Sequence, residues 1–201
     1  MARRFFEPES LVWTPFGYIG ELVMMSLLWG LCAIPLLTLG PATAALYDCA
    51  VHCLRRREGD LFARFFRTFR AELKIGILST LLWMLLLALP FALHLYAVGS
   101  LDSGFFKVLE GLALLLLFFL AAILCWVFPT LSRFTFGFAS LNRTALRLAL
   151  GNILRSVALL LLNLAAVLLV LLLAAPVLFA PGLAALLSSF LIEPVFRRYE
   201  A

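Results

Sequence analysis

Long uninterrupted apolar stretches constrain this chain more than any other feature of its sequence. Four of them, 17–38, 75–98, 108–131 and 153–175, are long enough to cross a bilayer, since a hydrocarbon core of about 30 Å requires about 20 apolar residues in a helix. The chain is 65% hydrophobic and only 13% charged, whereas a soluble domain is roughly 25% charged. A soluble core of this size cannot bury so much apolar surface, so the sequence predicts an all-α polytopic membrane protein.

Two shorter apolar segments, 41–54 and 182–194, each follow a proline. Proline in the first turn suits a helix that returns from a hairpin tip. Length alone does not decide whether these two segments cross the whole bilayer. The sequence therefore predicts a single integral membrane domain over residues 1–201, with about six membrane helices, two of them short, arranged as three hairpins over 1–54, 75–131 and 153–194.

The positive charges lie on one side of this arrangement. Of the 16 Lys and Arg residues, all except Lys107 fall within 1–16, 55–74, 132–155 and 195–201. Positively charged loops are retained on the cytoplasmic side of a membrane, so the pattern places both termini in the cytoplasm. A five-span arrangement without 41–54 would put the 55–74 cluster on the side opposite the N-terminal arginines. We therefore expect a multi-pass membrane protein with both termini in the cytoplasm.

The segment 61–74 has one apolar and one basic face. Its leucines and phenylalanines gather on one arc at helical spacing, and its basic residues lie on the opposite arc. This pattern predicts an amphipathic helix in the membrane interface, with 140–152 as a weaker counterpart. Membrane spans on both sides argue against a nucleic-acid partner. We expect the lipid bilayer as partner instead, with anionic lipid headgroups at Arg55, Arg56, Arg57, Arg64, Arg67, Arg70 and Lys74.

The stretch 45–59, ALYDCAVHCLRRREG, holds the densest group of potential metal ligands. Asp48 and His52 are four residues apart and share one helix face, whereas Cys49 and Cys53 share another. Four ligands on one straight helix cannot surround an ion, because its other side stays open. We therefore expect a hydrogen bond or ion pair between Asp48 and His52, packing roles for the cysteines, no metal and no cofactor.

Ionisable residues inside apolar segments are costly and are functional candidates by default. In the six-span arrangement five of them lie at similar depth near the cytoplasmic boundary: Glu21, Asp48, His52, Arg155 and Glu193. They could line a cytoplasm-facing cavity of a small transporter or lipid-binding protein, or form structural pairs, Glu21 with His52 and Arg155 with Glu193. Structural pairing is favoured, because each side chain is within snorkelling distance of water. The sequence contains no soluble-enzyme motif, so we expect no catalytic residues and no enzymatic activity.

Two motifs carry a family resemblance, LTLGPATAALYDC at 37–49 and REGDLFARFFRTFRAELK at 57–74. With them the chain resembles the YesL-like family of bacterial multi-pass membrane proteins, whose function is uncharacterised. The resemblance implies a non-enzymatic accessory or regulatory component associated with carbohydrate uptake, with sugar-transporter subunits as partners. The chain departs from the family pattern at Asp48, where an aromatic residue is usual, and at Cys49 and Cys53. The resemblance therefore gives no support for a metal site in this stretch.

Overall fold

The computed structural model describes residues 13–98, 104–173 and 178–200, and every regular element in these ranges is helical. The all-α class predicted from the sequence is confirmed. In chain order the elements are α1 (Trp13–Ala33), the 3₁₀ turn η2 (Leu36–Thr38), α2 (Leu39–Cys49), the π-helical turn η3 (Ala50–Arg55), α3 (Leu61–Ala71), α4 (Leu73–Val98), α5 (Gly104–Arg133), α6 (Phe138–Gly151), α7 (Ile153–Leu173) and α8 (Ala180–Glu200).

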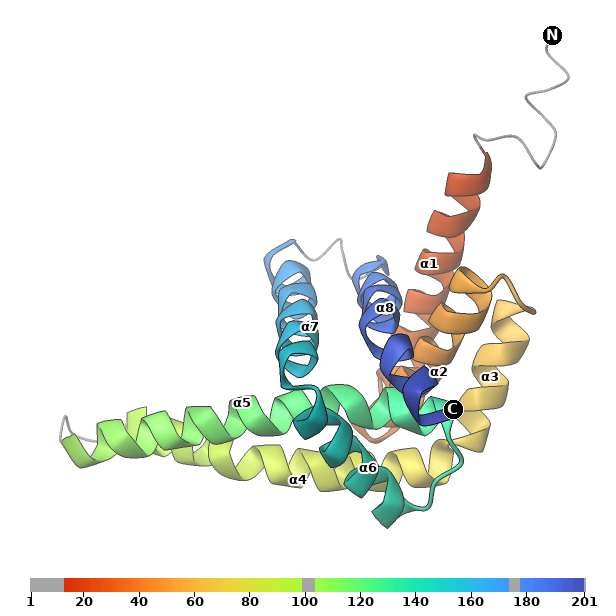
Figure 1. Ribbon diagram of the computed structural model, residues 1–201. Coiled ribbons are helices and arrows are strands. Elements are labelled where there is room, and N and C mark those ends of the chain that lie inside the picture. The colour runs from red at the N-terminus through yellow and green to blue at the C-terminus, as the bar shows by residue number, and fades with distance from the viewer. Residues whose placement is uncertain (1–12, 99–103, 174–177, 201) are drawn as a thin grey trace, which may run out of the picture.

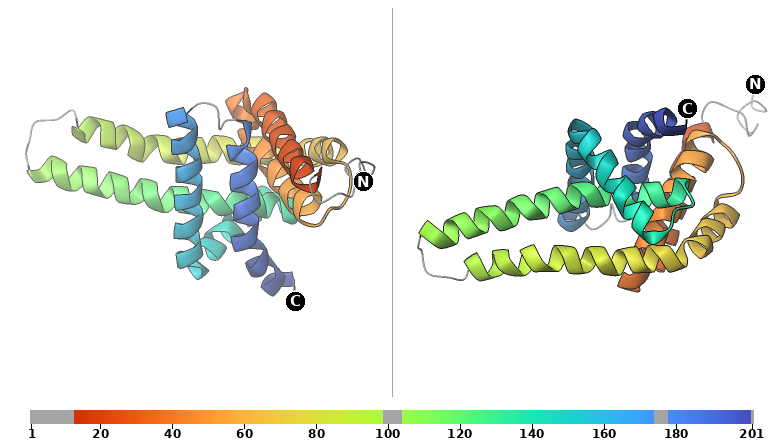
Figure 2. Two further views of the ribbon diagram at one scale, coloured as in Figure 1. Left: turned by 90° about the horizontal axis from the view of Figure 1, so that it is seen from above. Right: turned by 60° about the horizontal axis from the view of Figure 1, so that its bottom comes forward.

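Helices α4 and α5 form a long antiparallel hairpin, and the other helices gather around one half of it (Figure 1). Helices α7 and α8 lie beside each other and cross this hairpin at a steep angle in more than one view (Figure 2). The far ends of α4 and α5 project beyond the rest of the molecule. The expected arrangement of six membrane helices as three hairpins is therefore not confirmed.

Four helical segments are long and apolar enough to cross a membrane: Leu73–Val98, Gly104–Arg133, Ile153–Leu172 and Ala180–Arg198. A shorter apolar segment, Tyr18–Ala33, lies in α1. Large leucine side chains point outward from α4 and α7, among them Leu85, Leu89 and Leu171, each more than two-thirds exposed. Helices of this length with outward-facing leucines are compatible with a membrane protein, in which lipid tails cover such surfaces.

The predicted short segment 41–54 corresponds to α2 and η3, which lie in the centre of the molecule. Every residue from Ala44 to Val51 is buried, and α2 contacts α1, α3, α4, α5 and α8. Protein rather than lipid therefore surrounds most of this segment. The other short segment, predicted at 182–194, is longer in the structure, because α8 begins at Ala180 and continues through Pro194 to Glu200.

Glycine at position 40 allows α2 and α4 to approach closely. A Cβ atom at Gly40 would collide with the Thr80 hydroxyl, the Phe128 ring and the carbonyl oxygen of Gly76. The Gly40 N–H donates a hydrogen bond to Thr80 Oγ1 over 3.1 Å. Small residues let helix backbones pack closely in membrane proteins, and this crossing uses that property.

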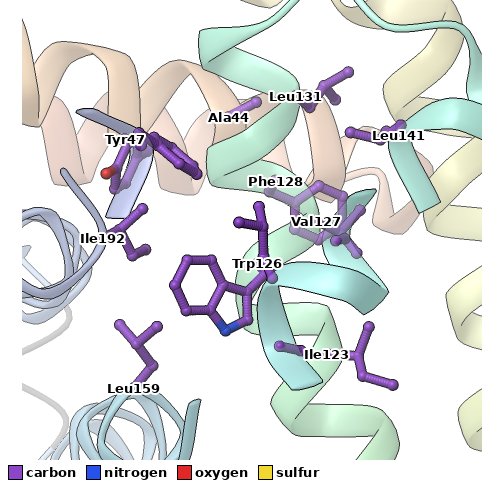
Figure 3. Close-up of a cluster of buried hydrophobic side chains, with 14 of the residues drawn as sticks. Ala44, Tyr47, Ile123, Trp126, Val127, Phe128, Leu131, Leu141, Leu159 and Ile192 are labelled. Atoms are coloured by element: carbon purple, nitrogen blue, oxygen red, sulfur yellow. The ribbon is translucent and has the colours of Figure 1, made fainter. Parts of the chain in front are cut away.

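Trp126 of α5 is fully buried at the centre of the larger apolar core (Figure 3). Its neighbours in that core include Tyr47 from α2, Leu159 from α7 and Ile192 from α8. The indole Nε1 donates to Ser156 Oγ over 2.8 Å. One aromatic ring thus joins the α4–α5 hairpin to the helices that cross it.

Both amphipathic helices predicted from the sequence are present, as α3 and α6. Each ends at a one-residue break, Glu72 or Asn152, and a long apolar helix follows. Helix α3 is shorter than predicted, so Lys74 belongs to α4. On its apolar face Phe65 is buried in the protein, whereas Phe62 and Phe66 remain exposed. The protein therefore covers part of the face that we expected to contact lipid.

Candidate functional site

Asp48, in the last turn of α2, is the most highly connected polar residue near the predicted site. Its carboxylate is buried and accepts two parallel hydrogen bonds from Arg64 of α3, from Nε to Oδ2 over 2.8 Å and from Nη2 to Oδ1 over 3.1 Å. The Thr68 hydroxyl donates to Oδ2 over 2.8 Å. His52 Nδ1 lies 2.9 Å from Oδ1, so the expected Asp48–His52 contact is present. Helix α3 is thereby fastened to α2.

Arg64 is turned inward, away from the lipid-facing role that the sequence suggested for it. Its side chain is 20% exposed. Burial acts to lower its pKa, but the hydrogen bond and the charge of Asp48 outweigh this effect, so the pKa of the guanidinium is raised. Arg67 and Arg70, also in α3, and Lys74 in α4 are exposed. These three keep the outward orientation predicted for contact with anionic lipid headgroups, and that contact stays a prediction.

The two cysteines of the stretch do not complete a metal site. Cys49 and Cys53 are free and buried, and Cys49 Sγ contacts the carbonyl oxygen of Leu61 over 3.7 Å. Within the ranges that the structure describes, no three His, Cys, Asp or Glu side chains are grouped so that they could hold a metal ion. The Asp48 carboxylate instead contacts Arg64, Thr68 and His52, as expected for a structural ion pair.

Beyond Asp48 the helix widens into the π-helical turn η3, which ends at Arg55. Arg57 then adopts a positive φ of 58°, followed by Gly59 with a φ of 81°. A residue other than glycine in this region carries about 1–3 kcal/mol of strain, which surrounding contacts must offset. The Arg57 guanidinium lies 3.6 Å from the centroid of the Tyr18 ring and 3.3 Å from Glu21. Contacts with α1 therefore hold the turn in place.

The three consecutive arginines fix η3 and the following turn to two different helices. Arg55 donates to the carbonyl oxygen of Ser189 over 3.1 Å and lies over the Phe190 ring, both in α8. Arg56 pairs with Glu193 of α8 over 3.3 Å, whereas Arg57 pairs with Glu21 of α1. The sequence predicted lipid headgroups as partners of these arginines and did not predict the intramolecular contacts.

Glu193 is one of the most buried residues of α8, with an exposed fraction of 1%. Arg56 lies 3.3 Å and Arg133 4.0 Å from its Oε2 atom. Its other carboxylate oxygen, the Tyr47 hydroxyl and the Thr130 hydroxyl are buried without a hydrogen-bond partner. The ends of α5 and η3 therefore meet at a carboxylate of α8.

The five residues of the predicted polar cluster are divided among separate contacts. Asp48 and His52 are together, and the partners of Glu21 and Glu193 are arginines of the turn after α2. The expected pairs of Glu21 with His52 and of Arg155 with Glu193 are wrong. Arg155 is in α7, and its buried Nη1 atom has no hydrogen-bond partner. Arg56 and Arg57 take the places of the expected partners: Arg56 pairs with Glu193, and Arg57 pairs with Glu21.

Sequence reasoning missed Thr68 and Arg133 as parts of these contacts. Thr68 lies one helical turn after Arg64, and this spacing is a signal that the two could reach one common acceptor. Arg133 is the last residue of α5, and nothing in its local sequence indicates that it faces a glutamate of α8. That contact depends on the tertiary packing.

Residues 22–92 match the model of a protein family described as "Protein of unknown function, DUF624". The matched range contains α2, η3 and α3 in full, with most of α1 and α4, and so includes the Asp48–Arg64 pair. No curated protein matches the chain at a significant level, and neither does any solved structure. Over residues 22–92 the chain is therefore similar to an uncharacterised family.

Proposed function

We propose that this chain is a non-enzymatic accessory protein of the bacterial cytoplasmic membrane, with both termini in the cytoplasm. The main support for this topology is that Arg56 and Arg133 both contact Glu193. These residues lie in or beside three different segments that we assigned to the cytoplasm, 55–74, 132–155 and 195–201. Their contact supports one common side for the three segments, and the positive-inside rule favours the cytoplasm for that side.

The contact between Arg57 and Glu21 extends this support to the first helix. Glu21 lies in the N-terminal half of α1, and the turn after η3 reaches it directly. The first half of α1 therefore lies on the same side as the 55–74 cluster. This agrees with cytoplasmic N and C termini.

Labelling of single cysteines from either side of the membrane tests the topology. In a variant with its four native cysteines replaced by serine, Arg70→Cys and Arg198→Cys should react only after the membrane is permeabilised. Lys107→Cys should react in intact cells, because it lies in the one predicted external segment with a positive charge. Opposite accessibility of positions 70 and 198 would rule out the proposed topology.

The role within carbohydrate uptake rests on the resemblance of 37–49 and 57–74 to the YesL-like family. It predicts that sugar-transporter subunits accompany the protein in native membranes. Crosslinking in intact cells, followed by affinity purification and mass spectrometry, should recover such subunits above the level found with an unrelated membrane protein of similar abundance. Recovery of none, with the labelling results as expected, would leave the topology intact and remove the uptake role.

A further inference from the structure

A cavity of about 420 Å³ lies between α1, α2, α5, α7 and α8. This volume falls within the range of about 300–1,000 Å³ that is typical of small-molecule sites. Its wall is mainly apolar, with Leu124 and Phe128 from α5 and Leu160 and Leu164 from α7. The residues that line the cavity include none of Glu21, Asp48, His52, Arg155 and Glu193.

Two polar residues in the cavity wall have hydrogen-bond partners within the protein. Thr43 Oγ1 donates to the carbonyl oxygen of Leu39 over 2.7 Å and accepts from Trp29 Nε1 over 3.1 Å. Asn163 Nδ2 donates to the carbonyl oxygen of Leu159 over 2.8 Å. Tyr47 differs, because its hydroxyl is buried and has no partner. A mainly apolar wall with few polar groups suits an apolar chain, and it does not suit a sugar, whose many hydroxyls would remain unpaired.

The cavity reaches the outer surface of the molecule at α7. Leu164 and Val167 line it, and they are also 59% and 55% exposed. Helix α7 is one of the segments apolar enough to cross a membrane, and in a bilayer the surface at this opening would face the hydrocarbon region. The molecules that reach the opening are therefore lipids.

At its inner end the cavity reaches α2. Thr43 and Leu39 retain partial exposure in a helix that is otherwise buried, and both line the cavity. A molecule in this cavity would lie among residues of α5, α7 and α8 and could touch Thr43 of α2. We propose that this cavity binds the acyl chain of a membrane lipid, which enters between these helices from the bilayer. This site is independent of the accessory role proposed above.

Photolabelling with a lipid probe tests the proposal directly. The full-length protein is placed in nanodiscs of phosphatidylethanolamine and phosphatidylglycerol, with a trace of phosphatidylglycerol that carries a diazirine in one acyl chain. After illumination, labelled residues are identified by mass spectrometry. We expect adducts on Thr43 and Leu124 inside the cavity, as well as on the outward-facing Leu85 of α4, which serves as the internal reference. Adducts on the outer faces alone would overturn the proposal.

Two neighbouring positions of α7 provide a matched pair of variants. Val167 lines the cavity opening, whereas Leu168 is absent from its wall, and their exposed fractions are almost equal at 55% and 54%. Val167→Trp should block the opening and abolish labelling of Thr43 relative to Leu85, whereas Leu168→Trp should leave this ratio unchanged. Equal effects of the two changes would contradict entry at this opening.

A second pair of variants fills the cavity from its wall, in case Val167→Trp disturbs folding. Ala121 lines the cavity from α5, and Leu115 of the same helix is 65% exposed on the outer surface. Ala121→Phe should abolish Thr43 labelling, and Leu115→Phe should preserve it, with the gel-filtration profile of each variant as the measure of folding. Unchanged labelling of Thr43 in a folded Ala121→Phe variant would overturn the site.

Discussion

Arg64 forms a bidentate ion pair with Asp48, with Nε 2.8 Å from Oδ2 and Nη2 3.1 Å from Oδ1. A guanidinium is planar and matches the two oxygens of a carboxylate, which makes such pairs both strong and specific. The pair joins the end of α2, where the helix changes to η3, to the first half of α3. It therefore fixes an amphipathic helix to the most buried helix of the protein.

Loss of the Asp48 carboxylate should destabilise the protein strongly. Asp48→Asn leaves the largely buried Arg64 without its counter-ion, which costs about 3 kcal/mol. Arg64→Lys should also lower the stability, although it keeps the positive charge, because an ammonium cannot form the two parallel hydrogen bonds. Thermal unfolding of the purified protein in detergent measures both effects.

Arg67→Ala is the matched control for the Asp48–Arg64 pair. Arg67 is in the same helix and has the same charge, but it is exposed. We expect its removal to change the unfolding temperature little, as for most surface positions. Equal unfolding temperatures for Asp48→Asn and Arg67→Ala would mean that the pair contributes nothing to stability.

The sequence predicted α3 and α6 well because each has a clear apolar and a clear polar face. It failed at Arg64, since helical periodicity places this residue with the solvated arginines. Its position beside Phe65 brings it to the edge of the buried face, where a carboxylate from another helix can reach it. Periodicity describes one helix at a time and does not include such a partner.

For a related physical reason, the sequence did not indicate that protein surrounds most of the segment 41–54, which was predicted as a short membrane helix. Hydropathy reports that a segment avoids water, and it does not distinguish burial in lipid from burial in protein. The small residues Gly40, Ala42 and Ala45 were a signal of close helix packing. No residue pattern in the sequence indicated that the helix would become π-helical at Ala50–Arg55.

Addition of one methyl group at Gly40 should weaken the contact of α2 with α4. The new Cβ of Gly40→Ala would collide with the Thr80 hydroxyl and with the backbone oxygen of Gly76, which cannot move independently of α4. We expect a lower unfolding temperature. Gly111→Ala in α5 is the control, since a Cβ there meets nothing within 4 Å. That change should be neutral or stabilising by about 1 kcal/mol, because alanine favours a helix more than glycine does.

Neutralisation of Glu193 should loosen the meeting point of α5, η3 and α8. Glu193→Gln keeps the shape of the side chain but leaves Arg56 and Arg133 close together without the carboxylate between them. We expect a lower unfolding temperature and faster proteolysis at the 55–60 turn. Glu110→Gln in α5 is the control, because Glu110 is partly exposed and its contact with His94 is long, at 3.8 Å. Equal proteolysis of the two variants would contradict a joining role for Glu193.

Removal of the Ser156 hydroxyl should leave the Trp126 indole N–H buried without an acceptor. An unsatisfied buried donor costs about 1–3 kcal/mol. Ser156→Ala should therefore lower the unfolding temperature and change the near-ultraviolet circular dichroism of the tryptophans. Ser140→Ala in α6 removes an exposed hydroxyl and should change neither signal. A Ser156→Ala variant with the stability of the parent protein would show that Trp126 has another acceptor.

The break between α3 and α4 should make stability depend on pH through Glu72. Burial raises the pKa of this carboxyl above its ordinary value of 4.5. The folded protein therefore holds the Glu72 proton to a higher pH than the unfolded chain does. A group with this behaviour contributes stability that is fully present below pH 4.5, and this stability is lost as the pH rises through the folded-state pKa.

Glu72→Gln removes this dependence, because an amide stays neutral throughout. We expect the variant to unfold at a higher temperature than the parent protein at neutral pH, where the parent must keep a carboxylate partly out of water. The difference should shrink as the pH falls through the raised pKa. Glu58→Gln, at an exposed position in the preceding turn, should show no such trend. A gain for Glu72→Gln that stays constant between neutral and acidic pH would exclude carboxylate burial as its cause.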